Sequence, residues 1–202
     1  MELLVIGCNF KTSAIGEREN WNIPPLQVSA FCQGFLQIAG VSGVVFLPTC
    51  NRVELYVTLQ KDVSLESIFS YWRQFLKLEG PGGTPGYIYK NDLAFSHLVK
   101  VCSGLDSLVV GEPQVLGQVK QAYSQSVEMG VASSLTNFVF QQAFRYAKQV
   151  RTETGVAKYP VSIASVALML AGEVFGDFSN LSALVVGLGE MGKQTAELLI
   201  KR

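Results

Sequence analysis

VVFLPTCNRVELYVT, residues 44–58, contains two apolar runs separated by a short polar connection. Residues 44–47 and 53–58 are rich in β-branched and aromatic side chains, which predicts two strands. The connection carries Cys50, although cysteine is usually buried in protein cores as a small hydrophobe. This position, with Arg52 two residues further on, makes the thiol the first candidate functional group.

The segments around this strand pair predict the rest of the first domain. In chain order we expect a strand, a helix, two strands, a helix and a strand at residues 3–8, 24–38, 44–47, 53–58, 64–78 and 87–90. Leu26 and Ala30 fit the apolar face of the first helix, Ser64 is the expected N-cap of the second, and residues 80–86 form a loop. This order is the split βαβ pattern of a ferredoxin-like α+β fold, with Cys50 between the second and third strands.

From residue 91 onward the apolar spacing is helical, which predicts a helical subdomain. Helices are expected at residues 91–102, from Pro113, at 135–152 and at 163–175. Asn91 or Asp92 is the expected cap of the first of these helices. Residues 153–162 break the pattern and predict a domain junction. The expected parts are a first domain, a linker with a helix, and the start of another domain, at residues 1–152, 153–182 and 183–202.

A glycine-rich motif lies near the end of the chain. Residues 187–192 fit G-x-G-x-x-G, follow the apolar run 183–186 and precede a helix-forming segment. This context predicts the first β-α unit of a Rossmann domain, in which a pyrophosphate binds at the helix N-terminus. A purely structural glycine turn is the alternative. The residue that reads the ribose lies about 20 positions further on, so we expect a truncated domain that binds a dinucleotide weakly.

The composition excludes several classes of protein. Hydrophobic residues make up 49% of the 202 positions, which predicts a folded chain, and 16 basic residues balance 16 acidic ones. A dedicated nucleic-acid-binding domain normally carries a basic excess, so any RNA contact is expected to be local. The four cysteines form no CxxC pair and there is one histidine, so no zinc site is expected. Without an export signal or an apolar run of about 20 residues, we expect a cytoplasmic protein with free thiols and no membrane association.

The Cys50 thiol and its neighbour Arg52 suggest nucleophilic chemistry. In an extended segment both side chains would point to the same side. A nearby guanidinium favours the thiolate, which is the nucleophilic form, or else Arg52 holds a substrate carboxylate in a bidentate fork. The alternative is an inert buried cysteine beside a solvated arginine. Cys8, Cys32 and Cys102 lie in apolar patterns, and we expect all three in the core.

Two further polar positions have both a functional and a structural interpretation. His97, the single histidine, is the first candidate for a general base to Cys50, but its apolar helical neighbours also fit a hydrogen-bonded core histidine. Gln114 and Gln118 are one turn apart on the helix opened by Pro113, so their amides can face one site. A solvated polar helix face is the alternative.

Four stretches, taken together, resemble one enzyme family. They are GCNFKTSAIGERE (7–19), LPTCNRVELYV (47–57), SGLDSLVVGEPQVLGQVKQA (103–122) and VVGLGEMG (185–192). In this order they are similar to glutamyl-tRNA reductase, the NADPH-dependent enzyme that opens the five-carbon route to tetrapyrroles such as heme and chlorophyll. The similarity spans nearly the whole chain, and TCNR and GEPQ-x-LGQVK are its most specific blocks. One departure is Phe10, where the family usually has a histidine, and we expect this substitution to be tolerated.

The resemblance implies a reaction and roles for individual residues. Cys50 would attack the ester carbonyl of glutamyl-tRNA, expel the tRNA and form a thioester, which NADPH reduces to glutamate-1-semialdehyde. His97 matches the family histidine important for activity. The residues implied around the glutamyl group are Thr49, Asn51, Arg52, Ser107, Glu112, Pro113, Gln114 and Gln118. Those implied at the NADPH phosphates are Gly187, Leu188, Gly189, Glu190, Met191 and Gly192.

The resemblance also implies partners and a longer parent chain. The family forms homodimers through a C-terminal helical domain that also grips the tRNA, and glutamate-1-semialdehyde aminomutase is the implied protein partner. Residues 1–202 would then be a catalytic domain, a linker and the first Rossmann unit, able to accept the glutamyl group but not to complete its reduction. A non-catalytic module of the same pathway and a different thioester-forming oxidoreductase are the alternatives.

Overall fold

Four strands form one antiparallel sheet in the structure, a computed structural model that describes residues 1–60, 63–78, 86–157, 163–187 and 189–200. The strands are β1 (Glu2–Asn9), β2 (Val41–Pro48), β3 (Arg52–Leu59) and β4 (Tyr87–Lys90). Their order across the sheet is β2-β3-β1-β4, and every neighbouring pair is antiparallel. All four strands agree with the sequence prediction, and with the helices they make an α+β domain.

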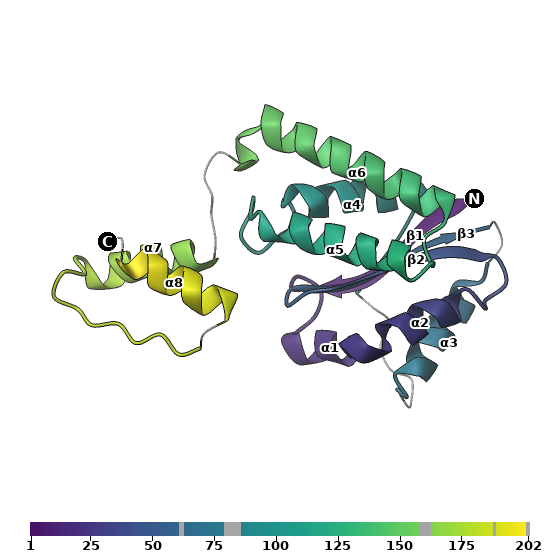
Figure 1. The fold of residues 1–202 in the computed structure, drawn as a ribbon, viewed down its shortest axis with the longest axis horizontal. Helices are drawn as coiled ribbons and strands as arrows, with labels where there is room; N and C mark the ends of the chain where they lie inside the picture. The colour runs from purple at the N-terminus through teal and green to yellow at the C-terminus, as the bar shows by residue number, and fades with distance from the viewer. Residues whose placement is uncertain (61–62, 79–85, 158–162, 188, 201–202) are drawn as a thin grey trace.

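Helices cover both faces of this sheet (Figure 1). One face packs against α2 (Val28–Phe35) and α3 (Leu65–Phe75) in a core rich in aromatic rings. The other face packs against α4 (Asn91–Ser103), α5 (Gln114–Glu128) and α6 (Ser134–Glu153). β3 is buried along its whole length because its side chains alternate between the two cores, Leu55 into the first and Tyr56 into the second.

The predicted helix at residues 24–38 is shorter than expected. Residues Pro25–Gln27 form a 3-10 turn, and α2 begins only at Val28 and ends at Phe35. Leu26 is therefore 98% exposed, and Ala30 is also exposed, so the prediction that they face the core was wrong. A six-residue helix, α1 (Ile15–Asn20), precedes this segment and was not predicted.

Two predicted helix caps have different outcomes. The Ser64 hydroxyl accepts the backbone N–H of Glu66 at 3.2 Å, which confirms Ser64 as the N-cap of α3. At α4 the N-cap is Lys90, not Asn91 or Asp92. The Asn91 side-chain oxygen instead accepts the backbone N–H of Leu3 at 3.1 Å, so it ties the helix to β1.

Beyond the sheet domain the chain continues through η2 (Gly155–Ala157), α7 (Ile163–Phe175) and α8 (Glu190–Ile200). The strand predicted at residues 183–186 is absent, since residues 181–187 belong to no helix or strand. A parallel strand needs neighbouring strands on which to pair, and Leu184 and Val186 are 88% and 89% exposed instead. Of the loop predicted at residues 80–86, all but Gly86 lies outside the described residues. No helix in the described part of the chain is long and apolar enough to cross a membrane.

Candidate active site

The connection between β2 and β3 is a tight turn that presents Cys50 to solvent. Thr49 closes this turn, because its hydroxyl accepts the N–H groups of Asn51 and Arg52 at 3.2 and 3.0 Å. Its own N–H donates to the carbonyl of Arg52 at 2.8 Å. Cys50 lies at the tip and is exposed. The turn chemistry of a Thr-Cys-Asn-Arg sequence therefore explains why this thiol faces outward.

The other three thiols are buried, as predicted. Cys8, Cys32 and Cys102 are at most 1% exposed and belong to the two cores. Burial raises the pKa of Cys32 and of Cys102 to about 12, and it also raises the pKa of Cys8. Among the four cysteines, Cys50 alone combines exposure with a polar setting.

A small pocket beside Cys50 brings together most of the residues predicted for the site. It forms where the β2–β3 turn meets the connection between α4 and α5 and the first turn of α5. The lining residues are Thr49, Cys50, Asn51, Arg52, Ser107, Glu112, Gln114, Val115 and Gln118. Val115 is the lining residue that sequence reasoning missed. Pro113 does not line the pocket and instead is the N-cap of α5.

The Ser107 hydroxyl in this pocket has no hydrogen-bond partner among the described residues. The residue is 5% exposed and its oxygen is fully buried. A buried polar atom without a partner carries a desolvation cost, which a bound ligand can offset. The pocket is therefore polar and incomplete without a ligand.

Arg52 is buried, and its guanidinium is held by two carboxylates. Its Nη1 donates to Glu54 Oε1 at 2.7 Å and to Asp106 Oδ2 at 3.2 Å, and its Nη2 donates to the Asp106 carbonyl and carboxylate. Lys11 also forms an ion pair with Asp106. The sequence left open whether Arg52 favours the Cys50 thiolate, holds a substrate carboxylate or is solvated. The structure contradicts the solvated arginine, because Arg52 is 1% exposed and forms ion pairs with Glu54 and Asp106.

Glu54 is the centre of this buried network. Its carboxylate accepts hydrogen bonds from Arg52, from the hydroxyls of Tyr56 and Tyr87, and from His97 Nε2. Burial by itself would raise the pKa of Glu54, but the charge of Arg52 and the hydrogen bonds hold it well below its usual range. Burial and the negative charge of Glu54 raise the pKa values of Tyr56 and Tyr87, so both phenols stay neutral donors.

His97 belongs to this network and does not line the pocket that contains Cys50. It is 8% exposed, its Nε2 lies 2.8 Å from Glu54 Oε1, and its ring packs 5.1 Å from those of Tyr87 and Tyr89. This geometry fits the hydrogen-bonded buried histidine, which was the alternative to a general base.

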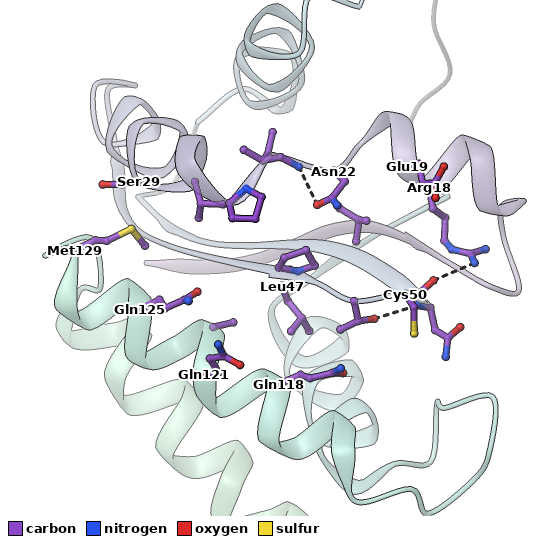
Figure 2. A pocket seen from close by; sticks show the side chains of 18 of the residues that line it. Arg18, Glu19, Asn22, Ser29, Leu47, Cys50, Gln118, Gln121, Gln125 and Met129 are labelled. Atoms are coloured by element: carbon purple, nitrogen blue, oxygen red, sulfur yellow. Dashed lines mark hydrogen bonds between the residues drawn. The ribbon is translucent and has the colours of Figure 1, made fainter. Parts of the chain in front are cut away.

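A larger groove of about 880 Å³ lies on the other side of Cys50 (Figure 2). The amides of Gln118, Gln121 and Gln125 follow one wall along α5, and α1 with residues 22–29 forms the opposite wall. Gln118 and the Thr-Cys-Asn turn line both the groove and the small pocket. The exposed thiol therefore stands between two hollows of different size.

Arg18 is another residue beside Cys50 that the sequence did not predict. It comes from α1, is 6% exposed and donates from Nη2 to the carbonyl of Cys50 at 3.2 Å (Figure 2). Its Nη1 donates to the carbonyl of Ser13. A six-residue helix is too short to show periodicity, so no sequence pattern placed this guanidinium beside the thiol.

Two glycines of the motif at residues 187–192 have backbone features that only glycine fits. Gly187 has φ +111°, a conformation that favours glycine, and a Cβ on Gly192 would overlap the carbonyl of Gly187. α8 begins at Glu190, so its unpaired N–H groups face the turn. These features fit a dinucleotide phosphate. Leu188 and the side chain of Glu190 lie outside the described residues.

A family model described as the glutamyl-tRNA(Glu) reductase N-terminal domain matches residues 6–154. The chain belongs to the glutamyl-tRNA reductase family. Both hollows beside Cys50 lie within the matched residues.

Individual glutamyl-tRNA reductases are similar along nearly the whole chain. The enzyme of Pseudomonas syringae pv. syringae is 38% identical over 192 residues, which cover 94% of this chain and 45% of that protein. The enzyme of Desulforudis audaxviator is 37% identical over 207 residues, 99% of this chain and 45% of that protein. The solved structure of glutamyl-tRNA reductase from Methanopyrus kandleri matches with a TM-score of 0.71 and 31% identity, over 98% of this chain and 46% of that one. The chain thus spans about half the length of these relatives.

Proposed function

We propose that residues 1–202 carry the acyl-transfer half of a glutamyl-tRNA reductase, with Cys50 as the nucleophile. The Cys50 sulfur attacks the ester carbonyl of glutamyl-tRNA, a C–S bond forms, and the C–O bond to the terminal ribose breaks. The ribose hydroxyl leaves with a proton, and the glutamyl group remains as a thioester. The observation that carries this proposal is that the exposed thiol shares a pocket with seven residues that the resemblance assigns to the glutamyl group.

The small pocket suits an amino acid because it contains one cationic and one anionic side chain. We assign the side-chain carboxylate of the glutamyl group to Arg52, whose guanidinium Glu54 holds from the buried side. Glu112 is 8% exposed and lines the same pocket, and we assign it to the α-ammonium group. The unpartnered Ser107 hydroxyl and the amides of Gln114 and Gln118 complete the hydrogen bonds. His97 acts in this proposal through Glu54, as a positioning residue for Arg52.

NADPH, when bound, supplies the hydride that reduces the thioester to glutamate-1-semialdehyde. Residues Gly187 to Gly192 would hold its pyrophosphate at the start of α8. The residues that read the adenosine ribose lie about 20 positions beyond such a motif, so residues 1–202 are not expected to complete the reduction. Without hydride, water slowly cleaves the thioester, and the chain behaves as a glutamyl-tRNA esterase.

The domain divisions follow from this proposal. Residues 1–152 are the catalytic domain, and the strand order β2-β3-β1-β4 supports a ferredoxin-like split βαβ topology for its sheet. Residues 153–182 are a linker with a helix, and residues 183–202 begin the NADPH-binding domain. The reaction is the first step of cytoplasmic five-carbon tetrapyrrole synthesis. We also assign a homodimer and glutamate-1-semialdehyde aminomutase as a protein partner, as the resemblance implies.

Single-turnover incubation with glutamyl-tRNA tests this function. The unaltered chain should release glutamate and form a transient acyl adduct on Cys50, detectable by mass spectrometry after acid quench. Cys50→Ser should abolish the adduct and slow the release at least tenfold. Cys32→Ser, which removes a buried thiol, is the matched control and should release glutamate at the original rate. Equal release by the Cys50→Ser variant and the unaltered chain would refute Cys50 as the nucleophile.

A further inference from the structure

The charge of Arg18 has no counter-ion in the described part of the protein. The residue is 6% exposed, and two of its N–H groups donate to backbone carbonyls, those of Ser13 and Cys50. Its Nε is buried without a hydrogen-bond partner. None of the ion pairs formed by the described residues includes Arg18.

This state of Arg18 contrasts with that of Arg52. Glu54 and Asp106 both pair with Arg52, so that guanidinium already has two carboxylate partners, whereas Arg18 has none among the described residues. A buried guanidinium without a carboxylate is costly, because burial removes its hydration and the two backbone carbonyls do not balance its charge. The charge of Arg18 is therefore available to an anion that enters from outside.

The groove gives such an anion a route to Arg18. Arg18 and Cys50 line the same end of this 880 Å³ groove, and Figure 2 shows the guanidinium directed at the Cys50 carbonyl. The small pocket on the other side of the thiol is assigned to the glutamyl group. The part of the substrate that leaves must then lie in the groove. Among the described residues that line the groove, Arg18 is the basic one and Glu19 and Glu128 are acidic, so an anion in the groove has its favourable position at Arg18.

We propose that Arg18 binds the phosphodiester nearest the acylated ribose and so holds the RNA leaving group in the groove during attack by Cys50. This inference rests on the proposed function. A phosphodiester is the anionic group closest to the ester in any aminoacylated RNA end, and a guanidinium matches two phosphate oxygens with two N–H groups. Because the same guanidinium holds the Cys50 carbonyl, one side chain links the leaving group to the nucleophile.

The first experiment measures the effect of the Arg18 charge at Cys50 and needs no RNA. Iodoacetate and iodoacetamide alkylate the same thiolate, so the ratio of their rates at Cys50 reports the electrostatic potential there and cancels thiol ionisation. Arg18→Gln should lower the iodoacetate-to-iodoacetamide ratio about threefold or more, because one nearby positive charge is removed. Arg145→Gln, at an exposed site on α6, is the matched control and should leave the ratio unchanged. An unchanged ratio in Arg18→Gln would overturn the proposal.

A measurement on the unaltered chain covers the case in which Arg18→Gln does not fold. Inorganic phosphate should slow alkylation of Cys50 by iodoacetate, at constant ionic strength against chloride, because it occupies Arg18. It should leave the iodoacetamide rate nearly unchanged. Equal effects of phosphate on the two reagents would speak against an anion site at this guanidinium.

Two acyl donors, one with a phosphodiester and one without, then test whether Arg18 binds the phosphodiester. Glutamyl-adenosine carries no phosphate, whereas the glutamyl ester of the dinucleotide CpA carries one phosphodiester. The unaltered chain should form the Cys50 adduct faster from the CpA donor, and Arg18→Gln should lose this advantage while Arg18→Lys keeps part of it. If Arg18→Gln slowed adduct formation by the same factor with both donors, Arg18 would have only a structural role. Failure of both donors with the unaltered chain would refute the proposed function, and the alkylation ratio would still decide whether the anion site exists.

Discussion

Single residues decide which groups of this site carry charge. Burial would raise the pKa of Glu54, but the charge of Arg52 and the hydrogen bonds lower it. The folded carboxyl therefore binds a proton less readily than the unfolded one. Its ionised form therefore contributes stability at pH values above the unfolded pKa. That contribution is lost as the pH falls toward the folded pKa, since the unfolded state then takes up more protons. Asp106, whose pKa is also lowered despite partial burial, acts in the same direction.

Replacing Glu54 with glutamine should reveal this contribution. The Glu54→Gln variant leaves Arg52 with a weaker partner in a buried setting, and we expect it to lower the free energy of unfolding by about 3 kcal/mol at neutral pH. Below the ordinary carboxyl pKa of 4.5, the unaltered chain should lose stability with falling pH more steeply than the variant. Urea unfolding at a series of pH values measures both effects. Glu66→Gln, at an exposed position on α3, is the control, and an acid slope in Glu54→Gln as steep as in that control would contradict the expectation.

The four thiols should differ sharply in reactivity. Cys50 is exposed at the tip of a turn, whereas burial excludes reagents from Cys8, Cys32 and Cys102 and raises their pKa values. Peptide mapping after a short exposure to iodoacetamide should find Cys50 labelled at least tenfold faster than the others. Similar labelling of all four in the folded chain would favour the non-catalytic alternative. A parallel reaction in urea, where all four should react alike, checks that the difference comes from the fold.

At the level of elements, the connection between α4 and α5 positions half of the small pocket. Gly104 and Gly111 both have positive φ, +77° and +88°, and the N–H of Gly111 donates to the carbonyl of Gly104 at 2.9 Å. The loop closed by this bond carries Ser107, and Glu112 follows it directly. Arg151 of α6 fixes the closure by donating to the carbonyls of Ser103 and Gly111.

A methyl group at position 111 should disturb this loop. In the Gly111→Ala variant the new Cβ would overlap the carbonyl of Val156, in a conformation that alanine also disfavours. We expect a loss of more than about 1 kcal/mol in the free energy of unfolding and slower acyl transfer to Cys50, since Glu112 is displaced. Gly117→Ala is the matched control, because a Cβ there meets nothing within 4 Å and alanine favours the helix interior of α5. Urea unfolding and single-turnover acylation compare the two, and equal behaviour would argue against the role of this loop.

The elements also show what the sequence could predict and what it could not. Strands and long helices carry a period in their side chains, so the four strands, α3, α4, α6 and α7 were predicted close to their observed bounds, as was the start of α5. Helix α1 and the 3-10 turn at residues 25–27 are too short to show such a period in their side chains. The pocket residues were found through the resemblance, but the pairing of Arg52 with Glu54 and Asp106, and the approach of Arg18 to Cys50, depend on contacts between distant segments.

Across the whole molecule, the packed cores and the candidate site lie in the same part of the chain. Both hydrophobic cores are drawn from residues 3–147, and both hollows beside Cys50 are lined by residues 15–129. By contrast, the glycine motif follows a segment in which Leu184 and Val186 are almost fully exposed. A β-α unit of this kind buries its apolar side chains only against further strands. The acyl-transfer half of the proposed reaction thus has a complete scaffold within the sheet domain.

A shortened chain tests this separation. Residues 1–157 keep both cores and both hollows, so we expect this chain to unfold at the same urea concentration as residues 1–202 and to cleave glutamyl-tRNA at a similar rate. The hydrogen bond from Gln114 to Gln194, at 3.5 Å between exposed side chains, is too weak to change this result. A Gln194→Ala variant of the longer chain isolates the contribution of that contact. If residues 1–157 fold but lose acyl transfer while Gln194→Ala retains it, α7 or α8 supports the thiol in a way that the sheet domain does not provide.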